Sequence, residues 1–235
     1  MTDQPYRRRP LLEPVHVVLP MRTVSGGKAR LGQALDAEER EELVLGLLLQ
    51  TLRVLGAWPA CRRIHIVSPD PVLGVATRQA GVEVSVHRQE GEGLNEGIRL
   101  GVSAACVEDA ASVLVLPGDL PLLDVGALDE LLLAADACLV AASGGPVMAI
   151  APADAGGGTN ALLLHPPEVI APSFGPSSFE AHLRAAESAE VAVQVVRDPI
   201  LGYDLDTPED LERLDPARLH ELTGLGRGAL DGVSA

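Results

Sequence analysis

Short apolar runs of strand type alternate with segments of helical periodicity over the first 140 residues of the chain. Strands rich in β-branched residues are predicted at residues 15–19, 63–67, 82–86 and 113–116. Helices are predicted between and after them at residues 36–57, 71–80, 95–106 and 124–135. The first helix begins at Asp36, with Glu39 in capping-box register. Because parallel strands need long crossover connections, this alternation predicts a three-layer α/β fold with a mainly parallel sheet.

The second half of the chain has a less regular pattern. Strands are predicted at residues 138–142, 147–151 and 191–196, with a further apolar run at 161–164 and a helix near 179–186. A loop at 198–208 precedes a short acidic helix from Glu209. No repeat or linker divides the sequence, so we expect one domain over residues 14–222, with mobile tails at 1–13 and 223–235.

Composition excludes several classes of function. A formal charge of −15 and an aromatic content of 2% disfavour a nucleic-acid partner, which needs basic surface and stacking groups. No window of 18 consecutive apolar residues is present, so no membrane span is expected. The three cysteines are far apart and the six histidines show no metal or triad spacing. We therefore expect a cytoplasmic protein with reduced cysteines and structural histidines.

A cationic loop follows the first predicted strand, in the pattern Pro20-x-Arg22-x5-Lys28-x-Arg30. It is not a P-loop, because Arg22 stands where glycine is needed and Ala29 where serine or threonine is needed. Lys28 is the only lysine among 18 basic residues, which favours a specific role for a compact ammonium. Ligands bind at the carboxyl ends of strands in open α/β sheets, so this loop suits a triphosphate. The alternative is an exposed basic loop without a ligand.

Three aspartates are candidate ligands for a divalent metal ion. Asp119 follows the predicted strand at 113–116, at the same edge of the sheet as the cationic loop. Asp204 and Asp206 are two residues apart, so both carboxylates face one side if this segment is extended. The alternatives are a turn residue for Asp119 and a helix cap for Asp206.

Two segments rich in glycine and hydroxyl groups, residues 156–160 and 174–178, could expose backbone N–H groups to a carboxylate or phosphate. Ser178 also stands at the start of a predicted helix, so an N-cap is the alternative for that residue.

These segments, in this order, resemble the 2-phospholactate/phosphoenolpyruvate guanylyltransferases of coenzyme F(420) biosynthesis. The resemblance covers about residues 15–214 and rests on Lys28-Ala29-Arg30-Leu31, Gly93-Leu94-Asn95, Leu116-Pro117-Gly118-Asp119-Leu120-Pro121, Gly158-Thr159-Asn160-Ala161-Leu162-Leu163, Phe174-Gly175-Pro176-Ser177-Ser178-Phe179 and Asp204-Leu205-Asp206-Thr207-Pro208. It implies a single Rossmann-like nucleotidyltransferase domain that uses GTP and Mg²⁺ to activate a small phospho-acid. It also implies that the product passes to a downstream deazaflavin transferase.

The resemblance assigns roles to residues of this chain. It implies that Lys28 and Asp119 are the catalytic residues and that Asp119, Asp204 and Asp206 hold Mg²⁺. The remaining roles fall to Arg22, Lys28, Arg30, Leu94 and Asn95 for the nucleotide, and to Thr159, Gly175 and Ser178 for the carboxylate of the phospho-acid. The chain departs from the family at Arg22, often lysine, and at Ala29, often serine, which affects the detailed role of the loop.

Several alternatives stay open from the sequence. Three acceptors are possible: phosphoenolpyruvate, 2-phospho-L-lactate and 3-phosphoglycerate. A composition typical of GC-rich bacteria favours phosphoenolpyruvate. A molybdopterin or sugar-phosphate nucleotidyltransferase is a second reading, although the glycine-rich loop of those enzymes is replaced here by Pro20-Met21-Arg22. A non-catalytic nucleotide-binding module is a third. Both a monomer and a homo-oligomer are compatible with the sequence.

Overall fold

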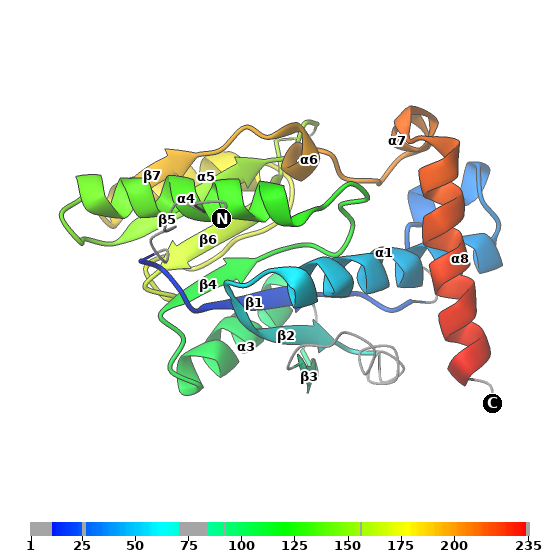
Figure 1. The fold of residues 1–235 in the computed structure, drawn as a ribbon, viewed down its shortest axis with the longest axis horizontal. Coiled ribbons are helices and arrows are strands. Elements are labelled where there is room, and N and C mark those ends of the chain that lie inside the picture. The colour runs from blue at the N-terminus through cyan, green and yellow to red at the C-terminus, as the bar shows by residue number, and fades with distance from the viewer. Residues whose placement is uncertain (1–10, 25–26, 71–83, 92, 156, 234–235) are drawn as a thin grey trace, which may run out of the picture.

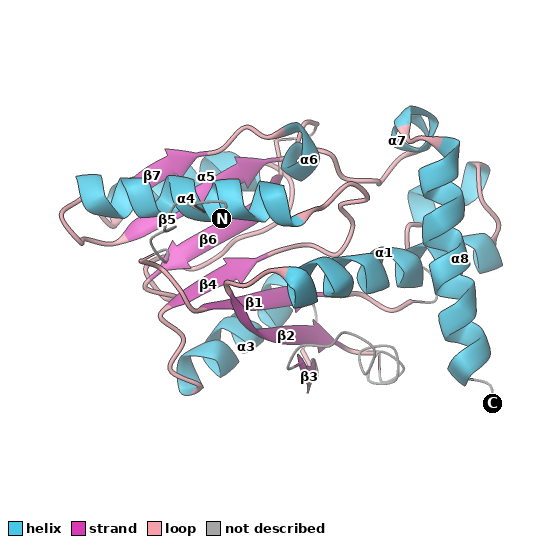
Figure 2. Cartoon of the chain, viewed as in Figure 1, coloured by secondary structure: helices cyan, strands magenta, loops and turns pink. Residues whose placement is uncertain are grey.

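A seven-stranded sheet forms the centre of the computed structural model, which describes residues 11–24, 27–70, 84–91, 93–155 and 157–233. Its strands are β1 (Val15–Pro20), β2 (Cys61–Ser68), β3 (Val84–Arg88), β4 (Ser112–Val115), β5 (Val147–Pro152), β6 (Thr159–His165) and β7 (Ala192–Val195). The strand order is β3-β2-β1-β4-β6-β5-β7 (Figure 2). All neighbours are parallel except β6, which is antiparallel to both β4 and β5. The predicted three-layer fold with a mainly parallel, mixed sheet is therefore confirmed.

Helices cover both faces of the sheet. The described helices are η1 (Ala29–Gln33), α1 (Ala37–Ala57), α3 (Leu94–Val107), α4 (Val125–Ala141), α5 (Ser178–Ser188), α6 (Pro199–Gly202), α7 (Pro208–Arg213) and α8 (Pro216–Val233). Of these, α1 and α4 cover one face of the sheet, and α3 and α5 cover the other. The capping box predicted for α1 is present: the Asp36 side chain accepts from the Glu39 N–H, and the Glu39 side chain accepts from the Asp36 N–H. The structure therefore confirms the sequence signal for the start of α1.

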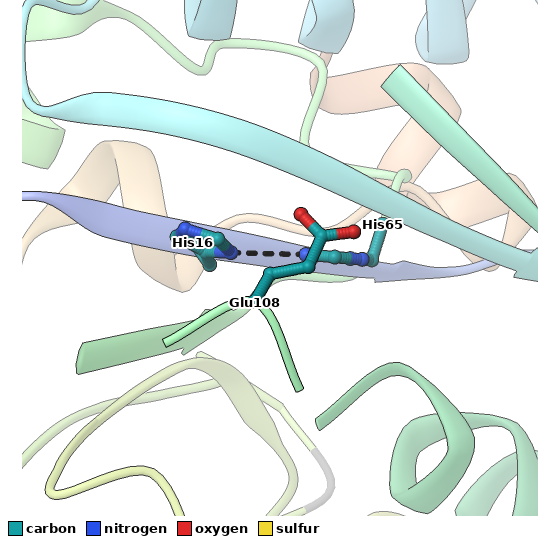
Figure 3. A group of neighbouring side chains, drawn as sticks. All are labelled: His16, His65 and Glu108. Carbon is teal, nitrogen blue, oxygen red and sulfur yellow. Dashed lines mark hydrogen bonds between the residues drawn. The ribbon is translucent and has the colours of Figure 1, made fainter. Parts of the chain in front are cut away.

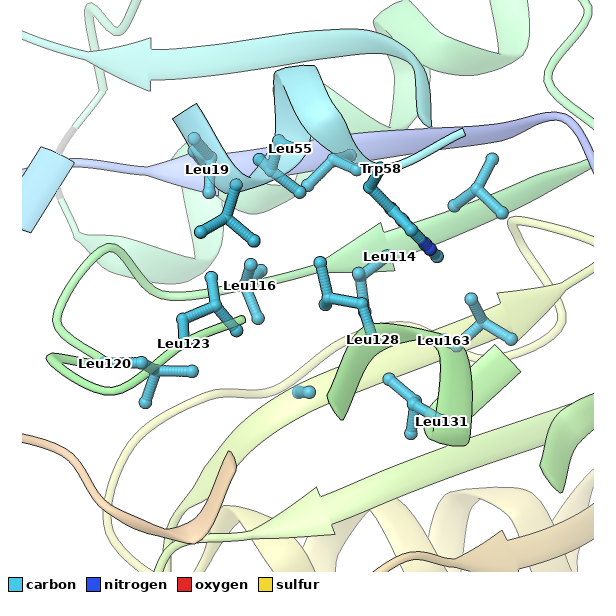
Figure 4. Close-up of a cluster of buried hydrophobic side chains, with 14 of the residues drawn as sticks. Leu19, Leu55, Trp58, Leu114, Leu116, Leu120, Leu123, Leu128, Leu131 and Leu163 are labelled. Atoms are coloured by element: carbon cyan, nitrogen blue, oxygen red, sulfur yellow. The ribbon is translucent and has the colours of Figure 1, made fainter. Parts of the chain in front are cut away.

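The apolar core lies in two layers because successive side chains of a strand point to opposite faces. Val17 and Leu19 of β1 pack with the layer of α1 and α4, whereas Val18 packs with the layer of α3. Leucines make up half of the buried residues of the first layer, where Trp58 is the largest fully buried side chain (Figure 4). This agrees with the scarcity of aromatic residues in the sequence.

Two element predictions differ from the structure. Residues 138–141 continue α4 instead of forming a strand, because a short apolar run cannot be distinguished from a buried helical turn by periodicity. The predicted loop at 198–208 contains α6, which the Asp198 side chain caps. The helix expected at 71–80 lies outside the described residues.

The expected C-terminal tail is also wrong as far as Val233, because α8 continues through it and packs across α1 (Figure 1). A Cβ atom on Gly46 would lie 1.8 Å from the Leu222 carbonyl oxygen, and one on Gly226 would lie 1.7 Å from that of Glu42. The two helices therefore touch backbone to backbone. Arg227 also donates to both carboxylate oxygens of Glu42, at 2.6 and 2.8 Å. Glycine lowers helix propensity, which hid this helix in the sequence.

The N-terminal expectation lies mostly outside the described residues. Leu11 and Leu12 are tied through their N–H groups to the Asp136 carboxylate, and Leu12 is fully buried. Among the described residues, no helix is both long enough and apolar enough to cross a membrane.

Candidate active site

A cavity of about 550 Å³ opens at the carboxyl ends of β1 and β4. These strands are parallel neighbours, so the loops that follow them meet at one edge of the sheet. Six residues predicted for the site line the cavity: Arg22, Lys28, Arg30, Leu94, Asp119 and Asp206. The structure therefore gathers the cationic loop and two of the three predicted metal ligands in one place.

Lys28 joins the two carboxylates of this cavity. Its Nζ atom donates to Asp119 Oδ2 at 2.9 Å and to Asp206 Oδ1 at 2.6 Å, and only 10% of its side chain is exposed. Burial alone would lower the pKa of Lys28, but the charges and hydrogen bonds of the two aspartates outweigh it and raise that pKa. The ammonium is therefore charged at neutral pH. Its backbone lies in the left-handed region at φ 52°, just before η1.

Asp204 lies beside this pair and is positioned by a buried amide. Asn160 Nδ2 donates to Asp204 Oδ1 at 3.2 Å and to the Gly202 carbonyl at 3.1 Å. Burial, and then the charge of Asp119, raise the pKa of Asp204 above its ordinary value. The three carboxylates therefore repel one another, and this local excess of negative charge favours a bound cation.

The helix-cap alternative for Asp206 is wrong. Thr207 caps α7, in a capping box with Asp210, which leaves the Asp206 carboxylate free to accept from Lys28. Between the two aspartates, the Leu205 N–H donates to the Asp119 carbonyl at 3.2 Å. This bond holds the segment of Asp204 and Asp206 against the loop after β4.

The segments rich in glycine and hydroxyl groups form a buried chain of hydrogen bonds. Ser178 Oγ donates to Thr159 Oγ1 at 3.2 Å, Thr159 bonds to His182 Nδ1 at 3.1 Å, and His182 Nε2 accepts from the Ser173 N–H at 2.9 Å. Ser178 is not the cap of α5, because Ser177 occupies that position. Neither Thr159 nor Ser178 lines the cavity, so their predicted contact with substrate stays a prediction.

The predicted nucleotide residues Leu94 and Asn95 behave differently. Leu94 lines the cavity, whereas the Asn95 amide both donates to the Phe174 carbonyl at 2.9 Å and accepts from its N–H at 2.7 Å. Phe174 is itself a wall of the cavity, and Gly175 follows it at φ +135°, where glycine is favoured. Asn95 therefore fixes the segment that carries Phe174 and Gly175. Neither this role nor that of Asn160 was predicted, since both depend on contacts distant in sequence.

The aspartates are suited to hold a divalent metal ion, because one of their buried oxygen atoms has no hydrogen-bond partner in the part of the chain that the structure describes. Among the described residues, Asp119 Oδ1 is a buried carboxylate oxygen with no hydrogen-bond partner. Carboxylate oxygens are the ligands that Mg²⁺ prefers. Asp119, Asp204 and Asp206 would hold such an ion. They do not form a compact ligand set as they stand, because the Lys28 ammonium lies between two of them.

Within the described part of the chain, one group of three potential ligands is compact: His16, His65 and Glu108, with atoms within 4.8 Å of one another (Figure 3). These atoms are already engaged. His16 Nδ1 and His65 Nε2 share a hydrogen bond of 3.0 Å, and Arg63 bonds to both oxygens of Glu108, at 2.8 and 3.3 Å. A cation here would have to displace a guanidinium and break the imidazole pair.

The histidines form a row across three strands, since His65 Nδ1 also bonds to His87 Nε2 at 3.0 Å. Burial is the main cause that lowers the pKa values of all three, that of His65 to about 4. The row is therefore neutral at pH 7. This row was not predicted from the sequence, because the three residues lie on separate strands.

This row predicts a loss of stability in mild acid. A pKa that is lower in the folded than in the unfolded chain means that unfolding takes up protons, so stability is full above the unfolded value of 6.5 and falls toward pH 4. The slope of unfolding free energy between pH 6 and pH 4.5 should be smaller in His65→Gln by about 1 kcal/mol per pH unit. Denaturant unfolding at several pH values measures it. The exposed His220→Gln is the control, and equal slopes in His65→Gln and the unmodified protein would contradict the prediction.

Sequence comparison finds that the chain is similar to proteins named as guanylyltransferases. Residues 15–215 match the family described as guanylyl transferase CofC like. A phosphoenolpyruvate guanylyltransferase of Rubrobacter xylanophilus is 43% identical over 205 residues, covering 86% of this chain and 93% of that protein. One of Sphaerobacter thermophilus is 38% identical, covering 84% and 90%. A 3-phospho-D-glycerate guanylyltransferase of Phenylobacterium zucineum is 34% identical, covering 82% and 86%.

Solved structures share the fold at low sequence identity. A cytidylyltransferase from Leptospira borgpetersenii has a TM-score of 0.55 at 15% identity, covering 94% of this chain and 96% of that one. A 4-diphosphocytidyl-2C-methyl-D-erythritol synthase from Anaerococcus prevotii has a TM-score of 0.56 at 11% identity, covering 86% and 94%. These likenesses support the nucleotidyltransferase type of fold alone.

Proposed function

Because the chain belongs to the CofC-like guanylyl transferase family, we propose that it transfers GMP from GTP to a small phospho-acid and releases pyrophosphate. The single observation that carries this proposal is the cavity in which Lys28 meets Asp119 and Asp206, with Arg22 and Arg30 on its wall. Cations for a triphosphate and carboxylates for a metal ion stand within one site of suitable volume.

The reaction needs charge neutralisation more than proton transfer. A phosphate oxygen of the acid attacks the α-phosphorus of GTP in line, a new P–O bond forms, and the bond to the β-phosphate breaks to release pyrophosphate. The attacking oxygen is already ionised at neutral pH, so no general base is required. The main barrier is the approach of two polyanions, which positioned cations relieve.

The residues divide this task between them. Lys28 and the exposed Arg22 and Arg30 would bind the triphosphate and the departing pyrophosphate. Asp119, Asp204 and Asp206 would hold Mg²⁺, which when bound offsets phosphate charge and orients the phosphates. Leu94, which also lines the cavity, would contact the nucleotide. Asn95 would keep Phe174, another residue that lines the cavity, in place.

The acceptor would lie beside Gly175, whose neighbour Phe174 forms the wall of the cavity. We infer that Thr159 and Ser178 act on its carboxylate by shaping the backbone there, because their hydroxyl groups are buried and paired with each other. Phosphoenolpyruvate is the favoured acceptor, since the relatives at 43% and 38% identity carry that name. A 3-phosphoglycerate acceptor is the second candidate, because the relative at 34% identity is named for it.

The proposal predicts release of pyrophosphate from GTP and Mg²⁺ that depends on the acceptor. Phosphoenolpyruvate, 2-phospho-L-lactate, 3-phosphoglycerate and a sugar 1-phosphate are offered separately, in an assay coupled to pyrophosphatase. We expect the highest kcat/KM with phosphoenolpyruvate, and a low rate when CTP or ATP replaces GTP. Release with the sugar phosphate alone would instead support the sugar-nucleotide alternative, and saturable GTP binding without release would support a non-catalytic module.

The place of the reaction in metabolism follows from its product, an anhydride of a phospho-acid with GMP. Such a product is an activated donor, and a transferase that moves the phospho-acid onto a deazaflavin acceptor of coenzyme F(420) biosynthesis would consume it. We propose this partner from the family resemblance, and a cytoplasmic location from the need for GTP and reduced cysteines.

A further inference from the structure

Lys28 occupies the position where the carboxylates of the site could share a metal ion. Its ammonium lies 2.9 Å from Asp119 Oδ2 and 2.6 Å from Asp206 Oδ1, with little exposure to solvent. The backbone of Lys28 is in the left-handed region, which lysine rarely adopts, and this conformation is the one in which the side chain reaches both carboxylates. The free enzyme therefore holds its own cation within the metal site.

The charges of the cluster are only partly balanced by this arrangement. Asp119, Asp204 and Asp206 contribute three carboxylates, and Lys28 alone of the described cations bonds to any of them. Asp119 Oδ1 is buried without a hydrogen-bond partner. The ammonium thus bonds to two carboxylate oxygens and leaves a third, Asp119 Oδ1, as a ligand for a divalent metal ion.

The ammonium and a metal ion would compete for the same two oxygens, Asp119 Oδ2 and Asp206 Oδ1. Oxygens bound to one Mg²⁺ ion lie at most about 4.2 Å apart, twice the usual Mg–O distance, so a metal ion that takes Asp119 Oδ2 and Asp206 Oδ1 as ligands leaves no room for the ammonium between them. We propose that Lys28 is an internal cation that stands in for the metal in the free enzyme and leaves its two carboxylates when the metal ion binds. This inference rests on the proposed function of the site.

The exchange would couple two binding events. Once released, Lys28 is free to bind the triphosphate, together with Arg22 and Arg30 on the same loop. In the free enzyme Lys28 is bonded to Asp119 and Asp206. The phosphate-binding loop is therefore complete only after a metal ion has replaced the ammonium at these two carboxylates. Without a metal ion, Lys28 would consequently not be available to bind the triphosphate of the nucleotide.

The composition of the chain offers a direct test, because Lys28 is its only lysine. Reductive methylation with formaldehyde and borohydride labels lysine and the α-amino group, and peptide mass spectrometry reads the two separately. The α-amino group serves as the internal reference. Labelling rates are compared in KCl and in MgCl₂ or MnCl₂ of equal ionic strength, and the EPR signal of free Mn²⁺ shows how much metal is bound.

We expect the labelling rate of Lys28, relative to the α-amino group, to rise roughly tenfold when metal binds, since two charge-assisted hydrogen bonds are lost. The variant Asp206→Asn should show a raised rate without metal, because one of the two partners has lost its charge. An unchanged rate at full Mn²⁺ occupancy, or an unchanged rate in Asp206→Asn, would overturn the proposal, as would a failure of Mn²⁺ to bind.

The result is separable from the proposed function. Pyrophosphate release by the unlabelled protein is measured on the same preparation. An active guanylyltransferase whose Lys28 stays protected with metal bound would overturn the exchange and leave the reaction in place. An inactive protein whose Lys28 is exposed by metal would support the exchange and count against the reaction.

Discussion

Asparagine in place of Asp119 is expected to lower kcat/KM for GTP by about 10²–10³, a loss of roughly 3–4 kcal/mol of transition-state stabilisation. The change keeps the shape of the side chain and removes one charge from a site where Asp119 Oδ2 pairs with Lys28 and Oδ1 is buried without a partner. An amide cannot supply that second oxygen to a cation. The pyrophosphate-release assay with phosphoenolpyruvate measures the effect.

A matched control separates this loss from a general effect of removing an aspartate. Asp109 is exposed, lies before β4 where Asp119 lies after it, and has a positive φ angle that asparagine also tolerates. Asp109→Asn should keep the rate within a factor of about two. Direct Mn²⁺ binding should weaken in Asp119→Asn alone. Near-normal turnover in Asp119→Asn would show that the cavity is not where the chemistry takes place.

Local sequence patterns predicted the part of the site that the sheet itself positions. Lys28 follows β1 and Asp119 follows β4, and strands identified from apolar runs place both at one edge by the general geometry of parallel sheets. The capping box of α1 was likewise a local signal. Family resemblance added the link from Asp206 to this edge, which periodicity alone could not supply across 87 residues from Asp119.

The features that sequence reasoning missed depend on contacts between distant segments. The Asn160 amide positions Asp204 from a strand, and the row of His16, His65 and His87 exists only because β1, β2 and β3 lie side by side. Neither has a spacing in the chain that could reveal it. The course of α8 was missed for the same reason, since its glycines read as breakers unless α1 lies against them.

Alanine at Gly46 is expected to lower the free energy of unfolding by about 3 kcal/mol, since overpacking forces well-packed helices apart. The added Cβ would lie 1.8 Å from the Leu222 carbonyl oxygen, so α8 must move away from α1. At roughly 2–4 °C per kcal/mol for a chain of this size, Tm should fall by about 6–12 °C in calorimetry. Activity should fall as well, because the cluster of α1 and α8 also contains Leu31 and Leu205, which support the segments of Lys28 and Asp206.

A Gly→Ala substitution at a second glycine of this region should change stability in the opposite direction. A Cβ atom on Gly224, in the same α8, would meet nothing within 4 Å, so Gly224→Ala should gain up to about 1 kcal/mol from helix propensity. If helix propensity alone decided the outcome, Gly46→Ala would be stabilising too. If the C-terminal segment were mobile, Gly224→Ala would have no effect on stability. Opposite shifts in Tm for the two alanine variants therefore require α8 to be a helix packed on α1. Two shifts of the same sign would contradict the close crossing, and with it the support that α8 gives to the loops of the active site.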